Sequence, residues 1–278
     1  MPEPFTIDSD GVILSGEVAG QGPPVVLLHG LTATRRYVVM GSRALERSGH
    51  RVIAYDARGH GRSSPAGDPG AYGYSHLVGD LGAVLDALEV ERAVLAGASM
   101  GAHTLLAYAL RSPERVGGLV VITPAYEPVE LDDPARLARW DRLAAGLRSG
   151  GIEGFVAAYG EPAGDPRFRD TVLKVIRQRL AQHDDLGALA DALEVVPRSR
   201  PFADVESLRA IAAPTVVVAS GDGADPGHPQ AVGEAYAAAI PGARLVTDPA
   251  GSSPVAWQGS RLSRLIAEIA REAALSAE

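Results

Sequence analysis

Short apolar runs alternate with amphipathic segments along most of the chain. The runs are rich in valine, leucine and isoleucine and stop at glycine or polar residues, which is typical of strands buried on both faces. They cover residues 25–30, 50–56, 92–97, 117–123, 214–220 and 243–247. Strands that alternate with helices predict an α/β fold with a mostly parallel central sheet flanked by helices.

Helical spacing of apolar residues marks two of the segments between the runs. The stripes that we expect to face the sheet are Leu77, Leu81, Val84, Leu85 and Leu88 in one helix and Leu262, Leu265, Ile266 and Ile269 in the other. Near the N-terminus, PFTID and GVILSGEV are joined by the turn-like SDG. This pair predicts an antiparallel hairpin at one edge of the sheet.

Residues 124–210 break the alternation, because they offer several helical stretches with no strand run between them. We therefore expect one α/β core formed by residues 1–123 and 211–278, with a helical cap inserted at 124–210. A chain of 278 residues is long enough for one large core with such an insertion.

Composition excludes several classes of protein and site. The chain has no cysteine, so disulfides, thiolate nucleophiles and zinc sites built on sulfur are ruled out. A formal charge of −8 opposes binding to nucleic acid. No apolar run approaches the ~20 residues that span a bilayer, so we expect no membrane partner. The acidic N-terminus does not resemble a signal peptide, which favours the cytoplasm; a homo-oligomer is compatible with the sequence.

GASMG at residues 97–101 lies directly between the run at 92–97 and the apolar segment AHTLLAYALR. A Gly-x-Ser-x-Gly sequence at such a junction is typical of a nucleophile elbow, in which a sharp turn exposes the serine hydroxyl at the carboxyl end of the sheet. The alternative is a plain turn whose serine caps the helix. Ser99 is therefore the candidate nucleophile.

Two further motifs precede the elbow, HGLT at 29–32 and DARGHGRSS at 56–64. Together the three motifs resemble the α/β-hydrolase superfamily, in that family's order and over nearly the whole chain. The resemblance implies the α/β-hydrolase fold and an oxyanion hole formed by the backbone N–H groups of Leu31 and Met100. Two such donors stabilise the charge that develops on a carbonyl oxygen. We interpret His29 and the turn around Asp56 as structural.

The family's acid follows a late strand, and GDGADPGHP at 221–229 follows the run at 214–220. Asp225 is the first choice and Asp222 the reserve, while the alternative for both is an ordinary exposed turn. The family's histidine would follow the last strand, where this chain has Ser252. A serine hydroxyl does not titrate near neutrality, so it cannot replace an imidazole as the base.

Three interpretations of Ser252 stay open. A displaced histidine is the first, and His228 leads because it lies three residues after Asp225, although a surface histidine is the competing interpretation. His103 is expected in the core, one helical turn after the elbow, and His183 is placed to reach the pocket from the cap. In the second interpretation the substrate or a water supplies the base. In the third, the chain is a relative that binds without turnover.

No histidine pair has the helical spacing of metal ligands, and no Gly-x-Gly-x-x-Gly follows the first core strand, so we expect neither a metal nor a cofactor. For the aromatic residues of the cap, packing is favoured over pocket lining; they are Trp140, Phe155, Tyr159 and Tyr126. The leading hypothesis is a serine hydrolase of a small ester, lactone or thioester, with Ser99 as nucleophile, Asp225 as acid and His228 as base. The alternative is a catalytically impaired pseudo-hydrolase that binds a small apolar molecule.

Overall fold

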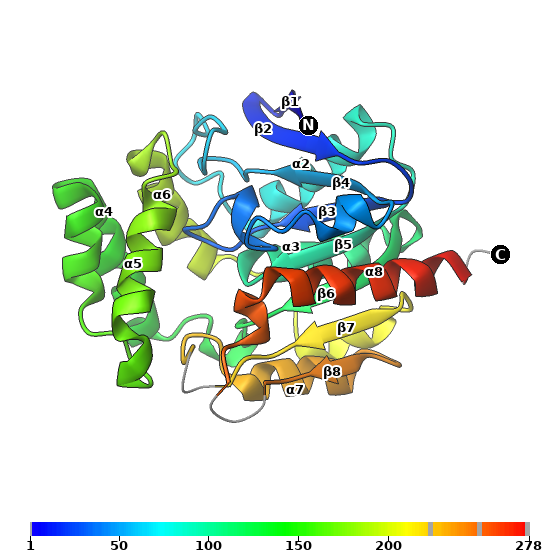
Figure 1. The fold of residues 1–278 in the computed structure, drawn as a ribbon. Coiled ribbons are helices and arrows are strands. Elements are labelled where there is room, and N and C mark those ends of the chain that lie inside the picture. Colours follow the sequence, from blue (N-terminus) through cyan, green and yellow to red (C-terminus); the bar gives the residue numbers. More distant parts are fainter. Residues whose placement is uncertain (1, 222–224, 249–251, 276–278) are drawn as a thin grey trace.

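The computed structural model describes residues 2–221, 225–248 and 252–275, and the reserve acid Asp222 lies outside these ranges. One eight-stranded sheet runs through the molecule in the order β1-β2-β4-β3-β5-β6-β7-β8 (Figure 1). The strands are β1 (Glu3–Ser9), β2 (Val12–Ala19), β3 (Pro24–Leu28), β4 (Arg51–Tyr55), β5 (Ala93–Ala98), β6 (Val116–Ile122), β7 (Thr215–Val218) and β8 (Arg244–Val246). From β4 to β8 every neighbouring pair is parallel, which confirms the predicted sheet.

The predicted N-terminal hairpin is confirmed as β1 and β2, which pair antiparallel from Ser9 and Val12 outward. Asp10 and Gly11 form its two-residue loop, with φ of 53° and 75°. Two successive positive φ angles give the loop a twist that matches the strands, and aspartate followed by glycine tolerates them best. Strand β2 also pairs antiparallel with β4, so the hairpin forms one edge of the sheet.

Helices cover both faces of the sheet (Figure 1). One face carries α2 (Tyr74–Ala87), α3 (Met100–Arg111) and α7 (Gln230–Ala239), and the other carries α1 (Ala44–Arg47) and α8 (Gly259–Leu275). The two apolar stripes predicted from sequence belong to α2 and α8, and most of their residues are confirmed as buried. The exceptions are Leu88, which follows the last residue of α2, and Leu265, both of which are only partly buried.

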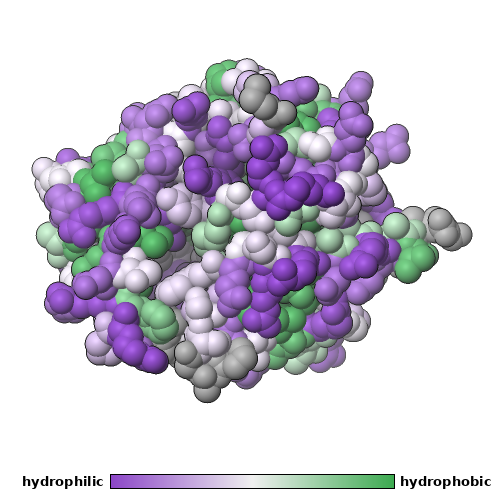
Figure 2. All heavy atoms as spheres, in the orientation of Figure 1, coloured by the Kyte–Doolittle hydropathy of each residue, from purple (hydrophilic) through white to green (hydrophobic). Residues whose placement is uncertain are grey.

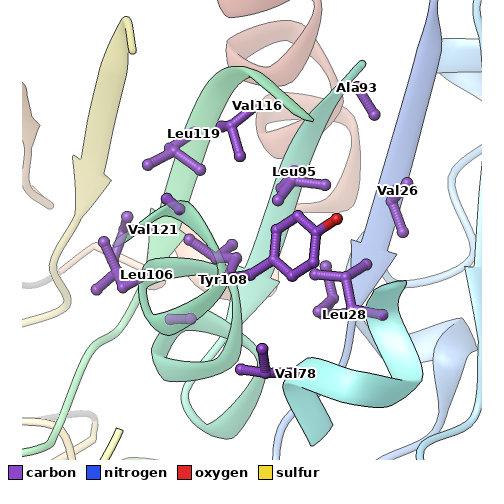
Figure 3. Close-up of a cluster of buried hydrophobic side chains, with 14 of the residues drawn as sticks. Val26, Leu28, Val78, Ala93, Leu95, Leu106, Tyr108, Val116, Leu119 and Val121 are labelled. Atoms are coloured by element: carbon purple, nitrogen blue, oxygen red, sulfur yellow. The ribbon is translucent and has the colours of Figure 1, made fainter. Parts of the chain in front are cut away.

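Side chains of the central strands alternate between the two apolar layers, as the period of two in a strand requires. In β5, Leu95 packs toward α2 and α3, whereas its neighbours Val94 and Ala96 pack toward α8. Figure 3 shows the layer on the α3 side, where Leu95 lies among side chains of β3, β6 and α3. All seven residues of β6 are buried, because helices cover the sheet on both sides there.

Between β6 and β7 the chain forms α4 (Pro134–Tyr159), α5 (Arg169–Leu180) and α6 (Leu186–Val195), which we call the α4–α6 segment. It stands beside the end of the sheet (Figure 1) and has an apolar cluster of its own. At Gly151 the backbone leaves the helical region, with φ of 58°, so α4 consists of two arms. The arms pack closely because a Cβ on Gly154 would lie 2.1 Å from the carbonyl oxygen of Gly146.

The surface is mixed in character. Figure 2 shows hydrophilic residues spread over the visible face, with apolar residues in small patches between them. Within the described ranges, none of the helices combines the length and the apolar character that crossing a bilayer requires.

Candidate active site

Ser99 occupies a strained position between β5 and α3. Its φ of 50° and ψ of −111° lie in a region that residues with a side chain rarely adopt. The Ser99 N–H donates to the carbonyl oxygen of Ile122, at 2.9 Å, so β6 holds the turn in place. The residue is half-buried, and its side chain makes no capping hydrogen bond to α3. The elbow geometry predicted from GASMG is therefore present, and the capping alternative is not.

The two glycines of the motif are required by close backbone contacts. A Cβ on Gly97 would lie 2.4 Å from the carbonyl oxygen of Gly101. A Cβ on Gly101 would lie 2.2 Å from the carbonyl oxygen of Leu28, at the end of β3. Both distances are far below any real contact, so a side chain at either position would displace the elbow from the sheet.

The loop after β3 lies directly against the elbow, since a Cβ on Gly30 would be 3.3 Å from Cβ of Ser99. In the part of the chain that the structure describes, the N–H groups of Leu31 and Met100 donate to no protein atom. The Leu31 side chain packs against the apolar cluster of the α4–α6 segment. The two predicted oxyanion donors are thus available next to the nucleophile.

His29 fixes this loop, as expected. Its Nε2 accepts a hydrogen bond from the N–H of Ala57 at 2.9 Å, so the proton lies on Nδ1, which donates to the carbonyl oxygen of Gly30 at 2.9 Å. Burial lowers the pKa of His29, and the ring stays neutral.

The turn around Asp56 is also structural. The Asp56 carboxylate accepts from the N–H of Arg35 at 2.9 Å and from the N–H of Arg62 at 3.1 Å, and it forms an ion pair with the Arg35 guanidinium. Nearby, Arg58 makes two hydrogen bonds to the buried Asp80 carboxylate, at 2.8 and 2.7 Å. The charges of Asp56, Arg58 and Asp80 are therefore paired within the protein, where they hold the turn in place.

His183 joins the α4–α6 segment to the core rather than entering a pocket. Its Nδ1 accepts from the N–H of Gly61 at 2.9 Å, and its Nε2 donates to the carbonyl oxygen of Thr32 at 3.1 Å. Burial lowers the pKa of His183 to about 4. The neutral ring therefore ties the segment to the loop that carries Leu31.

His103 is a satisfied core histidine, as expected. Its Nε2 accepts from the N–H groups of Ala125 and Tyr126, at 3.0 and 3.1 Å, and its Nδ1 lies 2.9 Å from the Tyr74 hydroxyl. Burial lowers the pKa of His103 to about 3, so the ring is neutral and holds the chain that leaves β6.

Asp225 and His228 meet in a tight turn after β7. The His228 N–H donates to the carbonyl oxygen of Asp225 at 3.0 Å across Pro226 and Gly227, which closes a β-turn. In the side chains, Nδ1 of His228 lies 2.9 Å from Oδ2 of Asp225, although the alignment falls short of an ideal hydrogen bond. The first-choice acid and the leading base candidate are thus in contact.

The charges around Asp225 favour its ionised form. Burial alone would raise the pKa of Asp225, but the nearby His228 ring and the charge of Arg179 together lower that pKa. An ionised carboxylate at Nδ1 orients an imidazole and stabilises its protonated form. The structure therefore places an ionised carboxylate beside one ring nitrogen of His228.

The pair lies in the neighbourhood of the elbow. Strand β5, which ends at the elbow, and strand β7, which precedes the turn with Asp225, both pair parallel with β6, so the elbow and this turn follow strand ends on the same edge of the sheet. Among the described residues, Oγ of Ser99 forms no hydrogen bond with an imidazole. Ser252 is half-buried and takes part in an interaction of its own.

Two charged residues near the site were missed by the sequence analysis. Arg179 in α5 is half-buried beside the buried residues Ile176 and Leu180, and its charge helps to lower the pKa of Asp225. Asp248 accepts from the N–H of Val255 at 2.5 Å and so anchors the loop that contains Ser252. Burial raises the pKa of Asp248. This burial could not be predicted from a sequence pattern.

The aromatic candidates pack as expected. Phe155, Trp140 and Tyr159 belong to the cluster within the α4–α6 segment, and Tyr126 belongs to the core beside the sheet. Within the described ranges, no three histidine or acidic side chains gather closely enough to hold a metal ion.

Residues 23–203 match the family model described as the alpha/beta hydrolase fold. The chain belongs to this family. The match includes the HGLT loop, the Asp56 turn, the elbow and the α4–α6 segment, so it confirms the resemblance and the predicted fold. The turn with Asp225 and His228 lies beyond the matched residues.

Solved structures agree over nearly the full length of this α/β hydrolase. A hydrolase from Pseudomonas aeruginosa PA01 is 30% identical, with a TM-score of 0.71 over 99% of this chain and 97% of that one. A thermophilic esterase from Thermogutta terrifontis is 26% identical, with a TM-score of 0.77 over 98% and 99% of the two chains.

Curated relatives match over shorter stretches. An epoxide hydrolase from Caballeronia sordidicola is 38% identical over 111 residues, which is 40% of this chain and 34% of that protein. An epoxide hydrolase from Siraitia grosvenorii is matched over 45% of its length. The chain therefore spans less than half of these curated relatives.

Proposed function

We propose that this α/β hydrolase is a cofactor-independent serine hydrolase of a small ester, lactone or thioester. Ser99 is the nucleophile, His228 the general base and Asp225 the acid that orients it. The observation that carries the proposal is the contact of 2.9 Å between His228 and Asp225, because it supplies the acid-supported imidazole that position 252 lacks. The similarity to an esterase over nearly the full chain is consistent with it.

In the proposed reaction, Nε2 of His228 takes the proton of Ser99 Oγ as that oxygen attacks the substrate carbonyl. The N–H groups of Leu31 and Met100 stabilise the oxyanion, an effect worth about 3 to 4 kcal/mol for each donor. His228 then returns the proton to the leaving oxygen or sulfur, and an acyl group stays on Ser99. Water, activated by the same imidazole, releases the acid.

The α4–α6 segment is proposed to act as the cap of this site. Its His183 donates to the carbonyl oxygen of Thr32 on one side, and on another side the ring of Phe168 packs against Trp257 with centroids 5.7 Å apart. A segment fixed at these contacts would exclude water from the acyl group, which strengthens the electrostatic stabilisation of the transition state.

A second candidate is a protein that binds a small apolar molecule without turnover. The observation in its favour is that Oγ of Ser99 has no imidazole partner among the described residues, while position 252 holds serine. In that case the elbow and the two free N–H groups would form a binding site for a carbonyl oxygen.

Hydrolysis of 4-nitrophenyl butyrate separates the two candidates. The serine hydrolase is expected to release 4-nitrophenol with an initial burst, and Ser99→Ala should lower kcat/KM by at least about 10³-fold. Folded protein that binds the ester but shows the same slow release with and without Ser99 would support the binding protein instead.

A further inference from the structure

A cleft lies on the side of the sheet that carries α1 and α8. Its volume is about 470 Å³, which falls within the range of small-molecule sites, roughly 300–1,000 Å³. Its apolar wall includes Leu27 of β3 and Val52 of β4, which belong to the apolar layer on this side of the sheet. None of the described residues that line the cleft belongs to the elbow or to the turn with Asp225 and His228. The cleft is therefore separate from the proposed active site.

The polar walls of the cleft carry more positive than negative charge. Within the described ranges, the charged residues that line it are the four arginines Arg35, Arg36, Arg43 and Arg62 and the three acids Glu17, Glu46 and Asp56. Each of the three carboxylates forms an ion pair with Arg35 or Arg43. By contrast, no described carboxylate lies within 4.0 Å of the guanidinium of Arg36 or Arg62. These two cations are left to a partner from outside the protein.

A tight turn holds Arg36 at the wall of the cleft. The N–H of Gly41 donates to the carbonyl oxygen of Arg36 at 2.9 Å, and Gly41 has a φ of 72°, in the left-handed region that favours glycine. The side chain of Arg36 lies over this glycine, since a Cβ on Gly41 would be 3.5 Å from Nε of Arg36. The turn therefore positions the Arg36 side chain.

The backbone of Arg62 is fixed from two sides. The N–H of Arg62 donates to the Asp56 carboxylate at 3.1 Å, and the N–H of Gly61 donates to Nδ1 of His183 at 2.9 Å. Gln182, which precedes His183 in the α4–α6 segment, lines the same cleft. An anion bound at Arg62 would therefore lie near the contact that joins the α4–α6 segment to the core.

Two unpaired guanidinium groups at one cavity match a ligand that carries two negative charges. Arginine binds the oxygens of carboxylates and phosphates through parallel N–H donors. A phosphate monoester has a charge of about −1.5 to −2 near neutral pH, and a dicarboxylate has a similar total charge. The chain as a whole is acidic, with a formal charge of −8, so the excess of arginine in this cleft does not follow from its general composition.

We propose that the cleft binds a small organic dianion, either a phosphate monoester or a dicarboxylate, through Arg36 and Arg62. The volume of the cleft leaves room for an organic body next to the charged groups. The inference does not depend on the proposed hydrolase function, because none of the residues of that reaction takes part in the binding.

Calorimetric titration at pH 7.5 and low salt tests the proposal. Phenyl phosphate and glutarate are the two dianions, and glutaramide is the neutral control of similar size. At least one dianion should bind the wild type, and glutaramide should not. Affinity should fall about 3- to 10-fold in Arg36→Gln or Arg62→Gln and about 10- to 100-fold in the double variant, as expected for charge-assisted hydrogen bonds near the surface.

Arg47→Gln is the matched control, since Arg47 is an exposed arginine of α1 that does not line the cleft and has no ion-pair partner among the described residues. This variant and Ser99→Ala should both bind the dianion as the wild type does. Binding of phenyl phosphate alone assigns the cleft to phosphate esters, binding of glutarate alone assigns it to dicarboxylates, and binding of both assigns it to either class.

Three results would overturn the inference. The first is that neither dianion binds the wild type at millimolar concentration. The second is that the double variant, with an unchanged circular dichroism spectrum, binds as tightly as the wild type. The third is that Arg47→Gln weakens binding as much as Arg36→Gln and Arg62→Gln do, which would show a general effect of surface charge instead of a site in the cleft.

Discussion

Buried neutral histidines make this protein sensitive to acid, and two of them allow the effect to be calculated. Burial lowers the pKa of His183 to about 4 and that of His103 to about 3, from 6.5. Above pH 6.5 neither the folded nor the unfolded chain binds these protons, so the histidines cost nothing there. As pH falls below 6.5, only the unfolded chain binds them, and folding loses free energy until the folded pKa is reached.

The magnitude follows from about 1.4 kcal/mol for each pH unit between the two pKa values. At pH 5, each histidine should cost the folded state about 2 kcal/mol relative to pH 7.5, and together about 4 kcal/mol. No discount for exposure is needed, because His183 and His103 are 8% and 5% exposed. The two rings share no hydrogen-bond partner, so their effects should add.

The variants His183→Asn and His103→Gln remove the titration and keep the main acceptor of each ring. The amide oxygen of asparagine replaces Nδ1, which accepts from Gly61, and that of glutamine replaces Nε2, which accepts from Ala125. Urea unfolding is followed by tryptophan fluorescence at pH 7.5 and pH 5.0. Each single variant should lose about 2 kcal/mol less than wild type between these pH values, and the double variant about 4 kcal/mol less.

Carboxylates also titrate in this range, but their contribution is common to all four proteins and cancels in the comparison. The reasoning would be refuted if the variants lost as much free energy of unfolding between pH 7.5 and 5.0 as the wild type does.

Three further predictions concern the elbow, the core and the position of the absent histidine. Gly101→Ala places a Cβ 2.2 Å from a backbone carbonyl of β3, so it should cost about 1–3 kcal/mol in urea unfolding, while Gly79→Ala in α2, with open space around it, should be neutral or stabilise by about 0.5–1 kcal/mol. Asp80→Asn breaks a buried ion pair with Arg58 and should destabilise by about 3–5 kcal/mol; a loss below 1 kcal/mol would mean that the pair contributes little. Ser252→His should raise the hydrolysis of an aryl ester, and no gain in a folded variant would show that position 252 does not face the nucleophile.

Much of the fold could be predicted because the signals are local. The buried strand β6 is an unbroken apolar run, and the hairpin loop Asp10-Gly11 holds the residue types that its φ angles require. The elbow could also be predicted, because the Gly-x-Ser-x-Gly pattern stands at a strand-to-helix junction and a Cβ on Gly97 would clash with Gly101, four residues away. At these positions the residue types favoured by the local backbone are also the ones that the folded structure requires.

The site was predicted less completely because its charges act through tertiary contacts. Asp225 and His228 were expected in the loop after the strand at 214–220, three residues apart. The structure shows that they form a turn and that their side chains are in contact. His183 bonds to Thr32, which is 151 residues away in the chain. The sequence around His183 therefore could not show whether it joins two parts of the fold or lines a pocket. Arg179 was missed because helical periodicity predicts that Ile176 and Leu180 are buried but does not predict which distant charges a half-buried arginine beside them will approach.

The central claim is that Ser99 is activated by His228 with the support of Asp225. Its most direct test is the rate at which a fluorophosphonate modifies the protein, measured by mass spectrometry. The account predicts one adduct, on Ser99, that is absent in Ser99→Ala and forms about 10²- to 10⁴-fold more slowly in His228→Ala. An intact fold with no adduct on Ser99, or labelling in His228→Ala at the wild-type rate, would contradict it.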